Sequence, residues 1–153
     1  MQDQLQLDPR AALEQRVLDV LEGKHGAYPL PEEARAILRV LRFHAGWERA
    51  IPLCELAERA AAASVHAAGI TDREVKQAVK TLTEDFGVPV GASRQTPNGY
   101  FLCVTREDLE IAVRPYILEG KSLFRRARAI AGNDVVEAAL GQLRLELGKD
   151  DAA

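Results

Sequence analysis

Apolar residues recur every three or four positions along most of the chain, and this spacing predicts a mainly helical protein. The first helix is expected over residues 8–23, because Asp8 suits the N-cap and Pro9 suits the first helical position. A second amphipathic helix is expected from Pro31 to about His44. The arginines on its polar side are typical of a solvated face; they are Arg35, Arg39 and Arg42.

The segment from Gly69 to Val104 predicts a capped helix that leads directly into a β-hairpin. Thr71-Asp-Arg-Glu74 has the spacing of a capping box, in which Thr and Glu side chains satisfy each other's backbone amides. The helix is therefore expected over residues 72–86. At about 100° per residue its apolar side chains fall on one side. The polar side chains on the opposite side are Arg73, Lys76, Gln77 and Lys80.

The hairpin is predicted from turn chemistry and alternation. Val88-Pro-Val90 begins a strand, Thr96-Pro-Asn-Gly99 is rich in turn formers, and apolar residues alternate from Tyr100 to Val104. Residues 93–99 form the expected hairpin tip, with Arg94 and Gln95 close to its end. Earlier in the chain, Ala50–Leu53 could supply a short strand, and residues 54–68 are expected to form a helix with an Ala-rich second half.

The C-terminal third is also predicted to be helical. Thr105-Arg-Glu-Asp108 resembles a second capping box, and a heptad spacing of apolar residues follows from Leu109 to Ile130. Pro115 and Gly120 interrupt that spacing, so a kink or a break into two helices is expected. A last helix is expected from residue 133 or 134 to Leu147, with an apolar stripe of Val136, Leu140, Leu143 and Leu147.

Composition agrees with a soluble single domain. The chain has 153 residues, 47% of them hydrophobic and 28% charged. It has no apolar run of the roughly 20 residues that a membrane helix needs, and its start lacks the pattern of a signal peptide. Cys54 and Cys103 do not have metal-ligand spacing. We therefore expect a cytoplasmic protein without membrane contact, with one domain over residues 8–147 and flexible tails at 1–7 and 148–153.

The distribution of charge qualifies the whole-chain value of −3. Residues 70–132 carry ten Lys or Arg against eight Asp or Glu, giving +2, whereas residues 133–153 carry two against five, giving −3. Binding responds to the local field at a patch, and most of the acid lies away from the 72–99 segment. Net charge therefore argues only mildly against a nucleic-acid partner.

Catalysis has little support in the sequence. His25, His44 and His66 are scattered, without a Cys or acid at ligand or triad spacing. The chain also lacks a Gly-rich phosphate loop and a G-x-S-x-G motif. We expect neither enzymatic activity nor a cofactor or bound metal.

Residues from about Ile37 to Thr105, and most clearly GITDREVKQAVKTLTEDFGVPVGASRQTPNGYFL, resemble winged helix-turn-helix domains, particularly those in small proteins of bacterial phages and mobile elements. The resemblance covers less than half of the chain. It implies a winged-helix core over about 31–104, with additional helices at 8–23 and 105–147. It also implies a DNA-binding role as a transcriptional or phage replication or regulatory factor. The sequence departs from the pattern at Ala60–Ala68, through either a longer helix or an insertion before the turn.

In that interpretation helix 72–86 enters the major groove of double-stranded DNA. Arg73 and Gln77 have the donors and acceptors to read base edges, Lys76 and Lys80 suit phosphates, and Arg94 and Gln95 suit the backbone or minor groove. Glu84, one turn beyond Lys80 on the same face, counts against this DNA-binding interpretation. The alternative is a winged-helix module that binds only proteins. The apolar stripes of 105–147 must be buried, either against the first helix or in a homodimer.

Overall fold

The computed structural model describes residues 8–64 and 69–150, and it divides the chain into two compact units, residues 1–113 and 114–153. The sequence indicated one domain over 8–147, with its C-terminal helical part beginning at residue 105. The boundary between the two units falls inside a long helix. The expected flexible tail at 1–7 lies outside the described residues. The tail expected at 148–153 is helical as far as Asp150, and residues 151–153 lie outside the described part.

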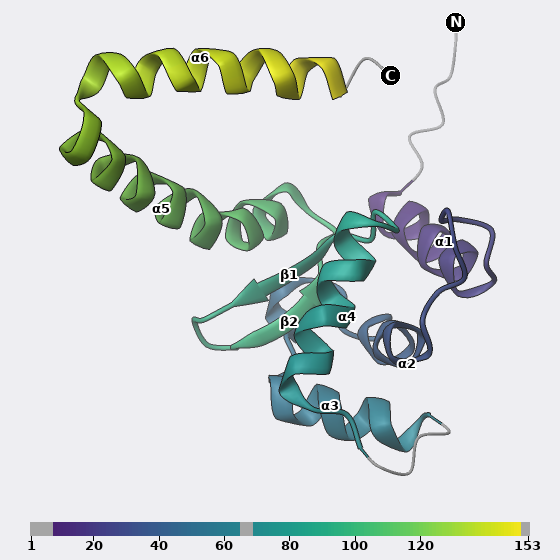
Figure 1. Cartoon of the computed structure of the whole chain (residues 1–153). Helices are drawn as coiled ribbons and strands as arrows, with labels where there is room; N and C mark the ends of the chain where they lie inside the picture. The colour runs from purple at the N-terminus through teal and green to yellow at the C-terminus, as the bar shows by residue number, and fades with distance from the viewer. Residues whose placement is uncertain (1–7, 65–68, 151–153) are drawn as a thin grey trace, which may run out of the picture. The chain divides into compact units, whose positions relative to one another are not determined.

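The first unit contains four α-helices and one β-hairpin, followed by the start of a fifth helix (Figure 1). Over the described residues the protein is therefore mainly helical with one two-stranded antiparallel hairpin, as the sequence predicts. The elements in chain order are α1 (Pro9–Leu21), α2 (Glu32–Leu41), the 3₁₀ turn η1 (Trp47–Arg49), α3 (Leu53–Ala62), α4 (Asp72–Glu84), β1 (Val90–Ser93), β2 (Gly99–Leu102) and α5 (Arg106–Ala131).

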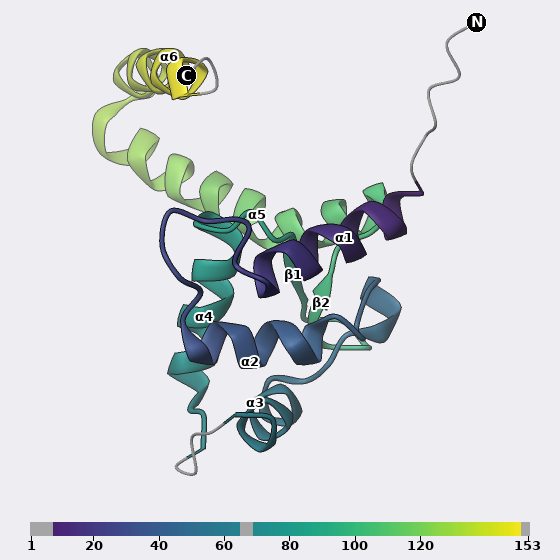
Figure 2. The same cartoon turned by 90° about the vertical axis from the view of Figure 1, so that its right-hand side faces the viewer.

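Helix α2 is the centre of this unit. It lies between α1 and α3 (Figure 2) and packs against α4 as well. Ala34, Ile37, Leu38 and Leu41 on its apolar face are almost fully buried, because neighbouring helices cover that face from several sides. Arg35 is not simply solvated as expected: its guanidinium donates to the Leu21 carbonyl at 2.7 Å and joins α2 to the end of α1.

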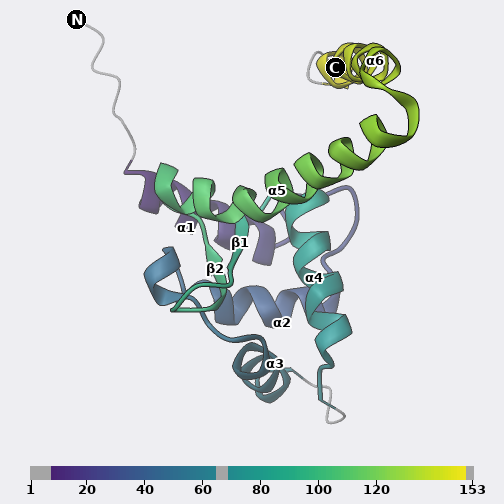
Figure 3. The ribbon, with the colours of Figure 1, turned by 90° about the vertical axis from the view of Figure 1, so that its left-hand side faces the viewer.

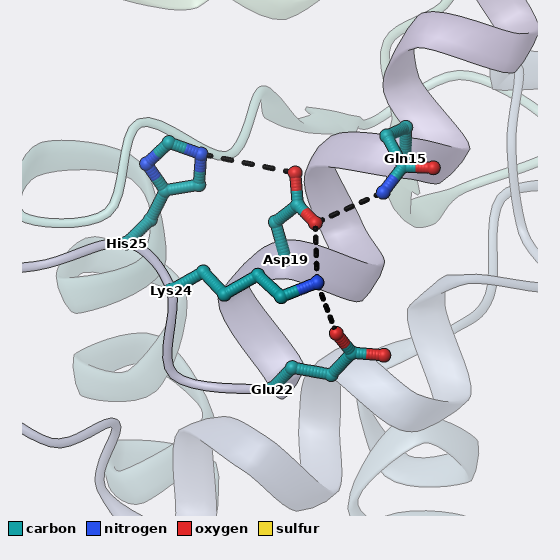
Figure 4. A network of polar contacts seen from close by, with 5 residues as sticks. All are labelled: Gln15, Asp19, Glu22, Lys24 and His25. Carbon is teal, nitrogen blue, oxygen red and sulfur yellow. Dashed lines mark hydrogen bonds and ion pairs between the residues drawn. The ribbon is translucent and has the colours of Figure 1, made fainter.

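The chain reverses after α1 through a polar network (Figure 4). The Asp19 carboxylate accepts from Gln15 Nε2 at 2.9 Å and from Lys24 Nζ at 3.5 Å, and His25 Nε2 lies 3.9 Å away. Lys24 also pairs with Glu22 at 2.6 Å. The hydrogen bond from Gln15 is the main cause that lowers the pKa of Asp19, and the nearby Lys24 and His25 lower it further. His25 is therefore part of the loop that ends α1.

Helix α4 begins at the predicted capping box. Glu74 N donates to Thr71 Oγ1 at 3.3 Å, and Thr71 N donates to Glu74 Oε2 at 2.7 Å. By contrast, α3 is shorter than expected, because it ends at Ala62. Residues 65–68 of the Ala-rich segment lie outside the described part.

The hairpin is held by a third segment of chain. β1 and β2 pair antiparallel with Val90 opposite Leu102 and Ser93 opposite Gly99. On the other side of β2, Ile51 and Tyr100 exchange two backbone hydrogen bonds of 2.8 Å. Leu102 N also donates to the His44 carbonyl at 2.9 Å. The short strand expected at Ala50–Leu53 is thus a single β-bridge at Ile51.

The second unit comprises residues 114–131 of α5 and helix α6 (Asn133–Asp150), joined at Gly132. Helix α5 runs without a break through Pro115 and Gly120, so of the two expected outcomes, a kink or a break into two helices, the break does not occur. A proline removes one backbone hydrogen bond from a helix, and here the turns on either side keep the segment helical. The apolar stripe is largely uncovered, with Tyr116 74% and Ile130 81% exposed. Val136 is the buried side chain of this unit among those described.

Candidate nucleic-acid interface

The exposed face of α4 carries the predicted basic residues. Val75, Ala78 and Leu82 face the core, which leaves the opposite side of the helix to solvent. Arg73, Lys76 and Lys80 are all exposed and share that side. Because positions three and four apart are neighbours on a helix, these three cationic groups form one surface, which we call the α4 basic face.

Acidic residues near the α4 basic face balance it in number. Residues 72–104 contain four basic and four acidic side chains. Most of the acids have partners in the structure: Glu74 closes the capping box, Asp85 accepts from the Tyr28 hydroxyl, and Glu84 lies 3.9 Å from Lys80. The Lys80–Glu84 pair is more than 60% exposed on both sides, so it is weak and a phosphate could compete for the lysine.

Gln77 is four positions from Arg73 and three from Lys80, so it lies on the same side of α4, at the edge that borders α2. It lines a cavity of ≈ 140 Å³ together with Glu33 and Ala34 of α2 and Thr81 of α4. Its side chain is exposed and also borders the junction with α2.

Arg94 and Gln95 lie at the hairpin tip, as predicted, and both are exposed. The tip is ordered by Ser93, whose hydroxyl accepts from Gln95 N and donates to the Gln95 carbonyl, both at 3.2 Å. No ion pair involves Arg94 among the described residues, so its guanidinium is available to an anionic partner. Helix α4 crosses the N-terminal end of α2, whereas the hairpin lies near the C-terminal end of α2 (Figure 3).

Helix α4 and the hairpin are fixed to the same core. Val88 N donates to the Leu82 carbonyl at 2.9 Å, which closes the end of α4 onto the start of the hairpin. Phe86 is 4% exposed and packs edge-to-face against Tyr28, with ring centroids 5.3 Å apart. These contacts join the end of α4 to the start of the hairpin and to the loop before α2.

A buried carboxylate secures the base of the hairpin. Asp108, in the first turn of α5, accepts hydrogen bonds of 2.9 Å from the backbone N–H groups of Trp47, Val104 and Thr105. Burial alone would raise the pKa of Asp108, but these hydrogen bonds outweigh it and hold the pKa below its ordinary value. The carboxylate therefore ties η1, the end of β2 and the start of α5 together.

The same carboxylate affects Cys103. Burial, and secondarily the charge of Asp108, raises the pKa of the Cys103 thiol to about 12. Its Sγ lies 3.7 Å from the Asp108 carbonyl oxygen. Cys103 is thus an inert core thiol, whereas Cys54 on α3 is exposed.

The histidines do not assemble a catalytic or metal site within the described residues. His25 joins the Asp19 network, His44 Nδ1 lies 2.8 Å from the Arg49 carbonyl oxygen, and His66 lies outside the described part. No cluster of three or more His, Cys, Asp or Glu side chains suited to a metal ion occurs in residues 8–64 and 69–150. Across those same ranges no helix is long and apolar enough to cross a bilayer.

Sequence reasoning missed one basic region. Arg10, Arg42 and Arg49 line a single groove, although they are 32 and 7 positions apart along the chain. Arg42 appeared in the sequence only as part of a solvated helix face, and neither Arg10 nor Arg49 stands in a recognisable motif. The fold brings the three together because the end of α2 and η1 pack beside α1.

Comparison of the chain with protein-family models, with curated proteins and with solved structures gave no match in any of the three.

Proposed function

We propose that the first unit binds double-stranded DNA as a winged helix-turn-helix, with α4 in the major groove and the 93–99 tip as the wing. The observation that carries this proposal is the α4 basic face, since α4 leads through Val88 into a hairpin with an exposed arginine at its tip. The element order supports it too: α2, a bridging segment, α3, α4 and a hairpin is the order of the resembled domain.

The contact proposed for each residue of this surface follows from the chemistry of its side chain. Lys76 and Lys80 suit phosphates, because an ammonium is a point charge that neutralises without reading sequence. Arg73 suits a guanine edge, because its guanidinium can donate two parallel hydrogen bonds. Arg94 and Gln95 suit the backbone or the minor groove. Gln77, beside α2, is the weakest of the proposed base contacts. A role as a transcriptional or phage-type regulatory factor is part of this proposal.

The test is binding of the full chain to a fluorescein-labelled duplex of mixed sequence, followed by anisotropy at about 50 mM salt. We expect measurable affinity, because sequence-independent contacts alone give Kd values of roughly 10⁻⁴–10⁻⁶ M at physiological salt and tighter ones at lower salt. The variant Arg73→Gln/Lys76→Gln/Lys80→Gln should bind at least about tenfold more weakly. Arg39→Gln, which removes an exposed arginine from α2, is the matched control and should bind like the parent chain.

The alternative function is a protein-binding module of the same shape. The equal numbers of acidic and basic side chains over residues 72–104 favour it, since DNA-binding surfaces are commonly basic. Absence of binding to any duplex at low salt, with an intact circular dichroism spectrum, would select this alternative.

We also propose that the second unit forms a homodimer. Nine large apolar side chains of residues 114–146 are at least 39% exposed; they are Tyr116, Ile117, Leu118, Leu123, Phe124, Ile130, Val135, Leu143 and Leu145. A wholly apolar cavity of ≈ 400 Å³ lies between α5 and α6, lined by residues such as Phe124 and Ile130. Two helices alone cannot bury such surface, and burial on the order of 800 Å² per partner is typical of a stable interface.

Charge supports a second copy as the occupant. Residues 114–131 of α5 carry five basic and one acidic side chain, giving +4, whereas α6 carries two basic and four acidic, giving −2. Within one chain the two helices already meet through Arg128 and Glu137, 2.7 Å apart. In a two-fold dimer the acidic helix of each copy can lie beside the basic helix of the other, which is one of the reciprocal arrangements that an isologous interface allows.

A further inference from the structure

A groove on the first unit combines an apolar floor with arginines on its rim. It has a cavity volume of ≈ 270 Å³, and residues of α1, the end of α2, η1 and β2 line it. Leu13, Val17 and Leu102 form the floor and are at most 8% exposed, so they belong to the core. Arg10, Arg42 and Arg49 lie on the rim with the single acid Glu14. The groove therefore has an excess of two positive charges.

The rim arginines differ in their partners. Arg10 Nε lies 3.5 Å from Glu14, so that pair is satisfied within α1. Arg42 stacks on the ring of Phe43, 4.9 Å from its centroid, and no carboxylate of the described residues lies within 4.0 Å of it or of the Arg49 guanidinium. Phe43 itself is 67% exposed, which is unusual for a large aromatic side chain. The groove thus presents an open aromatic surface beside two guanidinium groups without acidic partners.

From this arrangement we propose that the groove binds a small organic anion, a carboxylate or phosphate attached to a flat apolar body. The two arginines are suited to the anionic group, because a guanidinium donates two parallel hydrogen bonds to such oxygens. The apolar body would cover the floor and stack beside Phe43. The cavity is close to the small end of ligand sites, roughly 300 Å³, which fits a ligand of one or two rings.

The apolar floor sets this ligand class apart from nucleic-acid phosphate. A sugar-phosphate backbone has no flat apolar part to cover Leu13, Val17 and Leu102, so a phosphate contact alone would leave that floor unused. The proposal is also independent of the DNA-binding function, because every residue of the groove lies outside α4 and the hairpin tip. Ligand binding is therefore measurable in the absence of DNA.

The probe is 2-naphthoate, added to the ¹⁵N-labelled full chain and followed by backbone amide shifts. We expect saturable shifts centred on Leu13, Val17, Arg49 and Leu102. The neutral 2-naphthalenemethanol and inorganic phosphate each have half of the required chemistry and should bind at least about tenfold more weakly. Equal binding of inorganic phosphate would overturn the proposal in favour of a simple anion contact, and shifts confined to α5 and α6 would assign the probe to the apolar second unit instead.

Two variants test whether the charges of Arg42 and Arg49 bind the naphthoate carboxylate. Arg42→Gln/Arg49→Gln should weaken naphthoate binding by about tenfold or more, because charge-assisted hydrogen bonds are lost. Arg39→Gln, one turn earlier on α2 and outside the groove, is the matched control and should change the Kd less than about twofold. All three positions are exposed, so both variants should fold, and unchanged amide shifts away from the substitutions verify this. Unchanged naphthoate affinity in the double variant would refute the site.

Discussion

Asp108 and Trp47 lie 61 positions apart in the chain, and Asp108 Oδ1 accepts a hydrogen bond from the Trp47 backbone N–H at 2.9 Å. The other carboxylate oxygen accepts from the N–H groups of Val104 and Thr105. One buried carboxylate therefore accepts hydrogen bonds from three backbone N–H groups that have no partner in a regular strand or helix.

Replacing Asp108 should destabilise the protein in a pH-dependent way. Asp108→Asn should lower the free energy of unfolding by about 2–3 kcal/mol at pH 7, because hydrogen bonds to a charged acceptor are lost in a buried position. The pKa of Asp108 is lowered in the folded state. Its stabilising effect is thus fully present above the unfolded pKa of about 4 and disappears as the pH falls through the folded pKa.

Urea unfolding at pH 7 and near pH 3 measures this effect. The difference between the parent chain and Asp108→Asn should shrink on acidification, whereas Glu107→Gln, at the exposed neighbouring position, should stay within about 0.5 kcal/mol at both pH values. A constant difference between the parent and Asp108→Asn across this range would show that the carboxylate charge is not what stabilises the junction.

Gly99 is required by close backbone approach. Its φ is +126°, and a Cβ atom there would lie 1.9 Å from the Ile51 carbonyl oxygen. Gly99→Ala should destabilise the protein by more than about 3 kcal/mol, since both φ strain and displacement of the bridge add up. Gly46→Ala is the matched control, because Gly46 has φ +93° but open space around its Cβ position. Gly46→Ala should lower the free energy of unfolding by only about 1–2 kcal/mol, as measured by thermal unfolding. Equal losses of stability in the two variants would contradict the steric argument for Gly99.

The two cysteines should differ sharply towards thiol reagents. At pH 8 in native buffer a chromogenic disulfide reagent should titrate one thiol rapidly, the exposed Cys54. Cys103 should react only after unfolding, because burial raises its pKa to about 12 and the thiolate is the reactive form. Cys54→Ser should remove the rapid phase and leave one thiol that appears in urea. Rapid labelling of that variant would mean that the hairpin base opens readily.

Salt dependence should separate phosphate contacts from base contacts on α4. If Lys76 and Lys80 each neutralise one phosphate, replacing either with Gln should reduce the slope of log affinity against log salt by about one unit. Arg73→Gln should instead cost about 1–3 kcal/mol on a preferred sequence and little on others. Identical slopes for the parent chain and Lys76→Gln would remove that lysine from the interface.

The apolar second unit should control oligomeric state. Light scattering at micromolar concentration should give a mass of about two chains, with concentration-dependent dissociation. Leu123→Glu should shift the mass to one chain, because a charge would be buried without a partner. Ser122→Glu, on the adjacent exposed position of α5, controls for added charge. A monomeric parent chain, with Leu123→Glu leaving mass and solubility unchanged, would contradict the dimer.

Local signals predicted the elements of the first unit well, because each has a chemical cause within a few residues. Thr71 and Glu74 determine where α4 begins. Gly99 ends the turn of the hairpin and begins β2. Asp8 likewise accepts from Arg10 N at the start of α1, as an N-cap should. For the same reason the position of the α4 basic face followed from helical periodicity alone.

Features that depend on distant residues did not follow from the sequence. Nothing near Asp108 indicates that it reaches Trp47, and nothing near Ile51 indicates that it pairs with Tyr100. The Ala-rich segment looked like a continuous helix, because alanine favours helix wherever it occurs. The helix nevertheless ends at Ala62. The arginine groove is likewise created by packing, since its residues belong to separate elements.

The close approach of Gly99 to Ile51 has a consequence for how this protein can change over generations. The last pair of the hairpin before tip residues 94–98 is Ser93 and Gly99, and the neighbouring Ile51 segment is bonded to β2 at the next residue, Tyr100. Substitutions or short insertions among those five positions need not disturb the strands beneath, since lengthening a surface loop costs little. The tip is thus a place where new binding preferences can arise while the rest of the molecule is inherited unchanged.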